Sequence, residues 1–312
     1  WTADLYLPKH TAAAAPARVE LRSELRGVQV DLPEPFAKPA EASTAFALTA
    51  ELQGDGLGPL RLQYGDHSAA FSLTHSNGAL QLTRGEVKFG ATDATLPKTN
   101  GVRVAGSLPV FAWDAWRELL DGGEQTGLLR ALDVDIDSLR ALGRTFNGVQ
   151  IRARRDAGHW TATLGGPDME GTLELPPGKP ILLRCARLHI PAAVETDATT
   201  DTHVMGRIEP AGVPPLDVDV KQLQFRDLQL GHVNLKTHPL AAGLTVDALQ
   251  VEAEWMRLAA QGEWTRHAEQ DASRFRIDMQ GGDLGKMLTA FGYAGSIDGG
   301  ETTGRIDANW VG

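Results

Sequence analysis

Apolar and polar residues alternate one by one through most of this chain. Between Thr44 and Gln53, for example, Phe46, Leu48, Ala50 and Leu52 fall on one side. Successive side chains of a β-strand point to opposite faces, so this period of two predicts strands with one apolar and one polar face. The same reading applies to Val19 to Leu32, Leu60 to Tyr64, Leu182 to Leu188, Leu216 to Val220 and Thr303 to Val311. Asn77-Gly78, between two such strands, predicts a tight hairpin.

Only a few segments have helical spacing. The first is Phe111 to Leu120, which ends at Asp121-Gly122-Gly123, and the second is Asp283 to Phe291, which Asp283 caps and Gly292 ends. A third, Glu124 to Leu132, has a weaker pattern. The apolar side chains predicted to pack on the sheet or to cap its groove are Trp113, Trp116, Leu284, Met287, Leu288 and Phe291. The expected fold is therefore mainly β, with a long, curled antiparallel sheet and two or three short helices.

An internal repeat links two parts of the sheet. Leu132-Asp-Val-Asp-Ile136 matches Leu216-Asp-Val-Asp-Val220 at an offset of 84 residues, and apolar positions continue to match at that offset as far as Ala162 and Val246. Two copies of one β-meander unit explain this match. The predicted sections are an N-terminal meander that ends in a short helix (1–131), a first repeat unit with a loop-rich end (132–215), and a second repeat unit with a C-terminal helix and strand (216–312).

Bulk composition excludes several classes of function. A hydrophobic content of 42% is enough for a folded chain, and a formal net charge of -10 argues against a nucleic-acid groove. No apolar run is long enough to span a bilayer, and the chain begins with Trp1 and no signal peptide. We therefore expect an excised segment of a longer protein, with any membrane anchor outside it.

Residues that carry chemistry form no recognisable site. Asp133, Asp135 and Asp137 resemble the start of a calcium loop, but Ser138 replaces its glycine and Arg144 its bidentate glutamate. A strand with a polar outer face explains them better. The nine histidines are scattered without zinc spacing, and the single cysteine, Cys185, lies in a strand pattern that predicts a small buried side chain. We expect no metal, no cofactor and no catalysis.

With these residues in view, the chain resembles the YhdP family of AsmA-like envelope proteins of Gram-negative bacteria. The resemblance rests on Pro214 to Val220, Leu228 to Val233, Gly262-Glu263-Trp264, Gly281 to Leu288 and Phe291 to Gly300. It continues in Asn309-Trp310-Val311-Gly312, where the family commonly reads Ser-Trp-Pro-Gly. Fainter similarity covers most of the chain. These are signatures of turns and strands rather than of an active site.

Members of that family are similar to bridge-like lipid transfer proteins. The resemblance implies a segment of a taco-like β-groove in the periplasm, anchored in the inner membrane outside this chain, that conducts glycerophospholipids to the outer membrane. Its partners would be phospholipid acyl chains and components of both membranes. The candidate groove residues are Val134, Ile136, Val149, Ile151, Leu216, Val218, Val220, Val233, Leu235, Leu244, Val246, Leu249 and Val251.

Two other functions also fit the alternation. One is a structural or partner-binding scaffold whose apolar face is closed by the helices, because a filled core and a lipid groove both require apolar alternate positions. The other is a carbohydrate-active enzyme with a polar cleft and two close carboxylates beside an exposed tryptophan. Sequence alternation does not separate these functions.

Overall fold

A computed structural model describes residues 1–7, 16–53, 56–76, 78–120, 127–193, 212–267, 270–283, 285 and 299–311. Its strands are hydrogen-bonded into one sheet of 18 strands. The chain divides into two compact units: unit 1 comprises Trp1–Arg140 and Gln150–Arg155, and unit 2 comprises Ala141–Val149 and Asp156–Gly312. The prediction of a mainly β chain built on a single sheet is confirmed.

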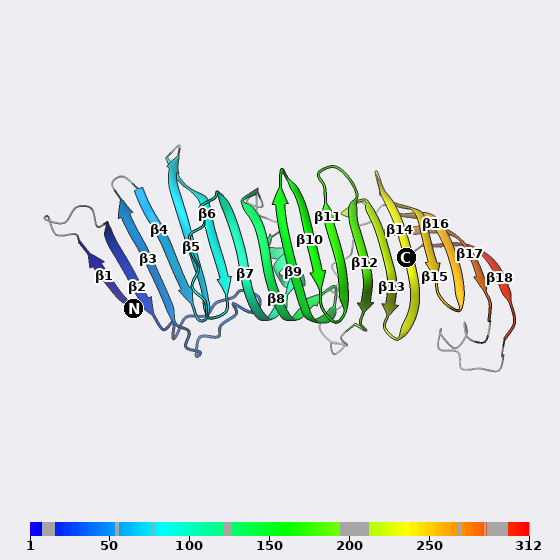
Figure 1. Cartoon of the computed structure of the whole chain (residues 1–312), viewed down its shortest axis with the longest axis horizontal. Helices are drawn as coiled ribbons and strands as arrows, with labels where there is room; N and C mark the ends of the chain where they lie inside the picture. The colour runs from blue at the N-terminus through cyan, green and yellow to red at the C-terminus, as the bar shows by residue number, and fades with distance from the viewer. Residues whose placement is uncertain are drawn as a thin grey trace. The chain divides into compact units, whose positions relative to one another are not determined.

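Unit 1 holds the first strands and the helix, and within it each strand pairs with its neighbour in sequence (Figure 1). Its elements are β1 (Thr2–Tyr6), β2 (Ala17–Ser23), β3 (Phe46–Gln53), β4 (Gly56–Tyr64), β5 (His67–Ser76), β6 (Ala79–Phe89), β7 (Gly101–Ala112), α1 (Trp113–Leu120) and β8 (Leu129–Ala141). The hairpin between β5 and β6 is confirmed, because Ser76 pairs with Ala79, whereas Asn77 itself lies outside the described residues.

Unit 2 holds the remaining strands, and β9 (Arg144–Asp156) has residues in both units. From β10 onward each strand again pairs with the next one along the chain. These strands are β10 (His159–Gly165), β11 (Met169–Leu175), β12 (Ile181–Ile190), β13 (Leu216–Phe225), β14 (Leu228–Leu240), β15 (Gly243–Glu252), β16 (Met256–His267), β17 (Gln270–Gly281) and β18 (Thr302–Val311).

Three strand pairs differ from the predicted antiparallel order. The pairs β6 with β7, β7 with β8, and β12 with β13 are parallel, whereas the other pairs with a defined register are antiparallel. A parallel pair needs a connection that returns the chain to the same edge of the sheet. The connection between β6 and β7 returns across the polar face, where Ser68 Oγ donates to Thr92 O and Glu86 Oε2 accepts from Thr95 N.

The helix predictions have mixed outcomes. The described residues contain one helix, α1, which begins two residues after the predicted Phe111 because Phe111 and Ala112 still belong to β7. The third predicted helix, Glu124 to Leu132, is wrong for its described end, since β8 begins at Leu129 and its alternation follows a strand. The second predicted helix falls almost wholly outside the described residues, as do its side chains at Leu284, Met287, Leu288 and Phe291.

The 84-residue offset recurs in the strand bounds. β9 and β14 have equal length and begin at Arg144 and Leu228, and β8 and β13 end at Ala141 and Phe225. The turns that follow β8 and β13 share a positive φ of 55° at Leu142 and at Arg226. Matching sequence positions therefore adopt matching strands and turns.

Candidate functional site

In unit 2, apolar side chains at one height form a row that crosses every strand from β10 to β18. The pairing registers bring together Ala162, Leu173, Leu183, Val218, Leu235, Leu249, Ala260, Ile277 and Ile306. Most members are half-buried, and Ile306 on the edge strand is 48% exposed. Because paired residues of neighbouring strands lie on the same face, the row is a continuous apolar track at right angles to the strands.

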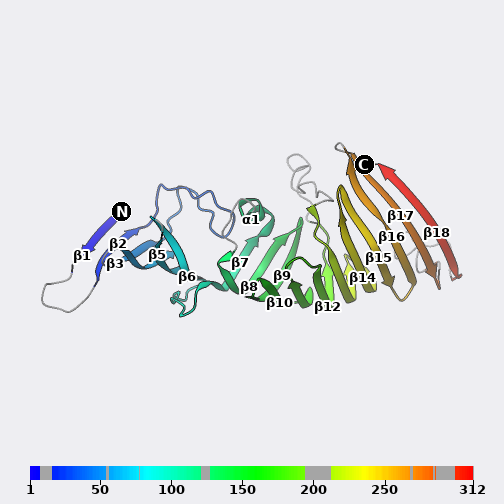
Figure 2. The same cartoon turned by 90° about the horizontal axis from the view of Figure 1, so that it is seen from above.

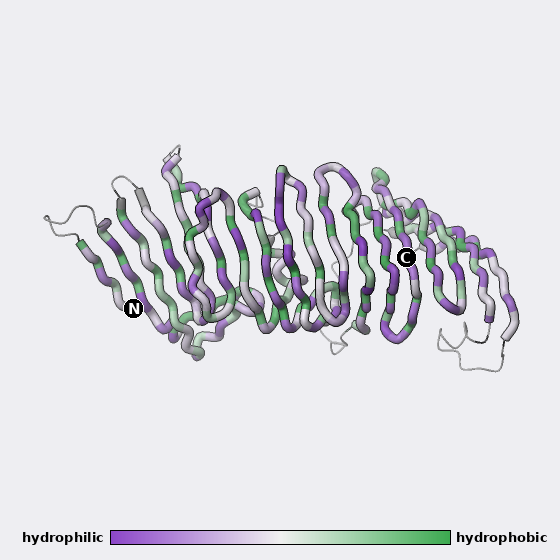
Figure 3. Tube along the Cα trace, viewed as in Figure 1, coloured by the Kyte–Doolittle hydropathy of each residue, from purple (hydrophilic) through white to green (hydrophobic). Residues whose placement is uncertain are grey.

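Unit 1 carries a row of the same kind. Its members, from β1 to β8, are Ala3, Leu21, Leu48, Leu62, Ala69, Val87, Val104 and Leu132. Figure 3 shows the same alternation as colours that change from residue to residue along the strands. Each unit therefore has one apolar face on which no strand interrupts the row.

β-Bulges keep the apolar face in phase along the longer strands. In β15 the register shifts between Val246 and Leu249, and in β13 it shifts between Val220 and Leu223. Without the shift in β15, Val246 would point to the opposite face from Leu249, because side chains alternate strictly in a regular strand. The extra residue in β15 turns Asp247 toward the polar side, where its carboxylate lies 2.7 Å from His238 Nδ1.

The opposite face of the sheet is lined with ion pairs. In unit 1, Arg152 contacts Asp133 at 2.8 Å and Asp135 at 2.7 Å. In unit 2, burial raises the pKa of Asp219, but hydrogen bonds from Lys221 and His232 outweigh it, so the pKa of this carboxyl is lowered. The interpretation of Leu132 to Ile136 as a strand with a polar outer face is confirmed.

The predicted groove residues of unit 2 share the apolar face. Val218, Leu235 and Leu249 belong to the row described above. Half-buried members are Leu216, Val218, Leu235, Val246 and Leu249, and the members with at most 7% exposure are Val220, Val233, Leu244 and Val251. Val233 and Val251 pack with Met256 and Trp255 in a cluster near the ends of their strands. Because these side chains are already covered, the half-buried residues are the ones best placed to contact a ligand.

In unit 1, Val134 and Ile136 lie on the apolar side of β8 and are each 3% exposed. Arg152 of β9 bonds to Asp133 and Asp135 on the polar side. Alternation therefore puts Ile151 and Val149, the latter 1% exposed, on the apolar side of β9.

Sequence reasoning missed an aromatic cluster in unit 1. The Phe36 ring contacts the rings of Tyr64, His67, Phe89 and Trp116, with centroid distances of 5.2 to 6.2 Å. Tyr64, His67 and Phe89 are residues of the apolar face, so residues 24–45 together with α1 cover one edge of it. Figure 2 shows this segment and α1 on the same side of the sheet. We name residues 24–45 the strap.

Hydrogen bonds fix the strap in place. Trp116 Nε1 donates to Glu34 O at 3.0 Å, and the Tyr64 hydroxyl donates to Phe36 O at 2.9 Å. The buried Lys38 ammonium donates to Val28 O at 2.6 Å. The sequence signal for the strap is weak, because the prolines on either side of Phe36 indicate an interruption of the strand pattern and no packing partner.

Among the described residues, no group of three or more His, Cys, Asp or Glu side chains is placed to hold a metal ion. Cys185 is 3% exposed, and burial raises the pKa of its thiol, so the prediction of a small buried side chain is confirmed. In the part of the chain that the structure covers, no helix has the length and hydrophobicity needed to cross a membrane.

The sequence model of the YhdP protein family matches residues 1–312, which is the whole chain. The chain belongs to the YhdP family. Searches of curated proteins and of solved structures found no match. The resemblance noted for the strand and turn signatures is therefore confirmed over its full length, and the long sheet is the fold of a YhdP-family segment.

Proposed function

We propose that this YhdP-family chain is a segment of a periplasm-spanning protein, anchored in the inner membrane, that conducts glycerophospholipids toward the outer membrane. The observation that carries the proposal is the apolar row that crosses consecutive strands without a polar residue in each unit. Membership of the YhdP family supports the proposal, because members of that family resemble bridge-like lipid transfer proteins.

The free energy to be overcome is that of exposing acyl chains to water. An acyl chain of about fifteen methylenes costs on the order of 12 kcal/mol at roughly 0.8 kcal/mol for each methylene, and a phospholipid has two such chains. A row at right angles to the strands supplies apolar contact at each successive strand. This removes much of the barrier without a nucleophile, an acid or a metal.

The alternative function is that of a β-scaffold whose apolar face is closed. The strap is the feature of unit 1 that bears on it. In unit 1 it covers the edge of the face near Phe36, but Leu48, Leu62 and Val87 of the row remain only half-buried. We therefore interpret the strap as a wall along one side of the apolar face rather than as a filled core.

Photo-crosslinking at neighbouring positions tests the proposal. A photoreactive amino acid at Leu235 or Leu249, which pair on the apolar face, is expected to give phospholipid adducts in cells. The matched controls are Asn234 and Gln250, which pair one residue away on the same two strands and face the polar side. Equal labelling of both pairs, or no lipid at Leu235 and Leu249 while a known lipid-binding protein is labelled, would contradict conduction along this face.

A further inference from the structure

Two arginines contact one phenylalanine ring at the end of β13. The guanidinium carbon of Arg144 lies 5.3 Å from the centroid of the Phe225 ring, and that of Arg226 lies 5.5 Å from it. Arg144 comes from the start of β9, and Arg226 from the turn after β13. Both cations are therefore held beside the same aromatic ring.

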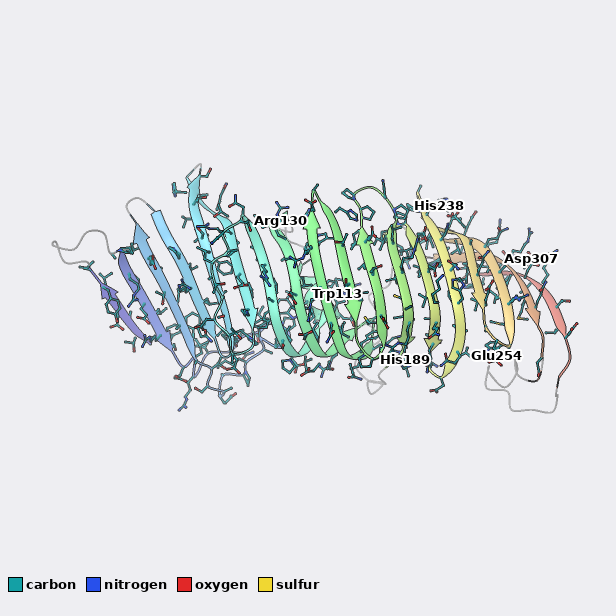
Figure 4. The ribbon with its side chains drawn as sticks, in the orientation of Figure 1. Trp113, Arg130, His189, His238, Glu254 and Asp307 are labelled. Atoms are coloured by element: carbon teal, nitrogen blue, oxygen red, sulfur yellow. The ribbon has the colours of Figure 1, made fainter. Side chains whose placement is uncertain are left out.

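Phe225 belongs to the apolar face. It pairs with Ile190 on β12 and with Leu228 on β14, and the bulge in β13 places it on the same side as Leu223 and Val220. It is the last residue of its strand, so it lies at the edge of the apolar face of unit 2. Figure 4 labels His189, the neighbour of Ile190, at this lower edge and His238 at the upper edge.

At this edge, Arg144 and Arg226 are each hydrogen-bonded to a backbone carbonyl. Arg144 Nη1 donates to Pro191 O, and the backbone N of Arg226 donates to Ile190 O at 2.8 Å. Within the described part of the chain, no carboxylate forms an ion pair with either guanidinium. By contrast, Arg276 and Arg305 on the polar face contact Asp307 and Asp278 at 3.1 and 2.6 Å.

Two cations beside one ring, with no ion-paired carboxylate among the described residues, attract an anion even in a chain of net charge -10. The planar guanidinium fork matches the oxygens of a phosphate and forms charge-assisted hydrogen bonds with them. Because the cations stand where the apolar face ends, the ligand that satisfies both surfaces is an amphiphile with an anionic head and apolar chains.

We propose that Arg144, Arg226 and Phe225 form a binding site for the phosphodiester headgroup of a phospholipid whose acyl chains lie on the apolar row of unit 2. This inference rests on the proposed function and adds to it a position for the headgroup. Phe225 keeps both guanidinium groups at the edge, and the phosphate accepts hydrogen bonds from them.

The test compares two lipids that share acyl chains and differ in the phosphate. The purified chain is mixed with vesicles that carry fluorescent phosphatidylglycerol or fluorescent diacylglycerol, and the lipid bound to the protein is measured. In the Arg144→Gln/Arg226→Gln variant we expect phosphatidylglycerol affinity to fall about tenfold or more, from the loss of charge-assisted hydrogen bonds. Diacylglycerol affinity should stay unchanged.

The control variant, Arg276→Gln/Arg305→Gln, removes the same charge from the polar face and should leave both affinities unchanged. If the Arg144→Gln/Arg226→Gln chain does not fold, Arg226→Gln alone gives the same comparison, because this side chain is exposed.

The outcomes separate the two proposals. Failure of the unaltered chain to bind either lipid would overturn the proposed function. Normal binding of both lipids by the Arg144→Gln/Arg226→Gln variant would overturn only the headgroup site. Binding of sn-glycerol 3-phosphate as tightly as of phosphatidylglycerol, measured by calorimetry, would indicate a site for a free anion and would also overturn it.

Discussion

At the scale of single residues, two glycines make room for phenylalanine rings on the apolar face. A Cβ added to Gly262 would lie 2.6 Å from Phe275 Cδ1 and 2.2 Å from Arg274 O. In unit 1, a Cβ at Gly85 would lie 2.4 Å from Phe71 Cδ1. In both cases the ring of one strand covers the glycine paired with it on the next strand. The ring shields backbone that the missing side chain would leave exposed.

Replacing Gly262 tests this packing. The change Gly262→Ala is expected to lower the free energy of unfolding by about 1–3 kcal/mol, because the added methyl overlaps a backbone oxygen and a ring. Gly304→Ala is the control, since its Cβ would meet only Met279 Cε at 3.7 Å. Urea unfolding measures the stability of both variants. Equal stability would contradict this account, because it would show that β17 moves to accommodate the added methyl without loss of stability.

At the scale of elements, the packing of the strap affects the ionisation of His67. The His67 ring lies 5.2 Å from that of Phe36 and 5.6 Å from that of Phe89, and its Nδ1 accepts a hydrogen bond from Gly90 N at 3.4 Å. Burial lowers the pKa of this imidazole, and nearby Asp66 opposes the effect only in part. The folded chain therefore favours the neutral form of His67.

This pKa shift predicts a pH dependence of stability. At a pH near the ordinary histidine pKa of about 6.5, the unfolded chain binds more protons than the folded one. The stability associated with neutral His67 is thus complete above that pH and is lost as the pH falls toward the folded pKa. NMR titration should give a His67 pKa below 6.5, and Phe36→Ala should move it back toward that value. A His67 pKa at or above the ordinary value would contradict this account of the strap.

Much of this element-level structure was accessible from sequence, and the rest depends on distant contacts. Alternation predicted most strands and the shared face of Val218, Leu235 and Leu249, because a period of two fixes the side on which a residue lies. It did not predict the parallel pairing of β6 with β7. That pairing depends on the hydrogen bonds that residues 90–100 form with side chains of β5 and β6. Arg144 and Phe225 are far apart in sequence, and no motif indicated that their side chains meet.

At the scale of the whole molecule, continuity of the row is the property on which the proposed function depends. A single carboxylate within it is expected to stop transport while leaving the sheet folded. Leu249→Asp is suitable, since Leu249 is half-buried and sits between Leu235 and Ala260 in the row. We expect the full-length protein with Leu249→Asp to fail to complement a strain that lacks this protein. The full-length protein with Gln250→Asp, on the polar face, should complement the same strain. Growth with both variants, given equal protein levels, would contradict a requirement for an unbroken row.

The direction of the apolar rows also determines how a bound molecule would move. Neighbouring strands are about 4.8 Å apart, so the row from β10 to β18 advances in equal steps of that size. After each step an acyl chain would exchange contact with one aliphatic side chain for contact with another at the same height. The free energy of a bound chain would change little from strand to strand, because each member of the row is an aliphatic side chain. Sliding along it would need no fuel within the segment, and friction rather than binding strength would set the rate.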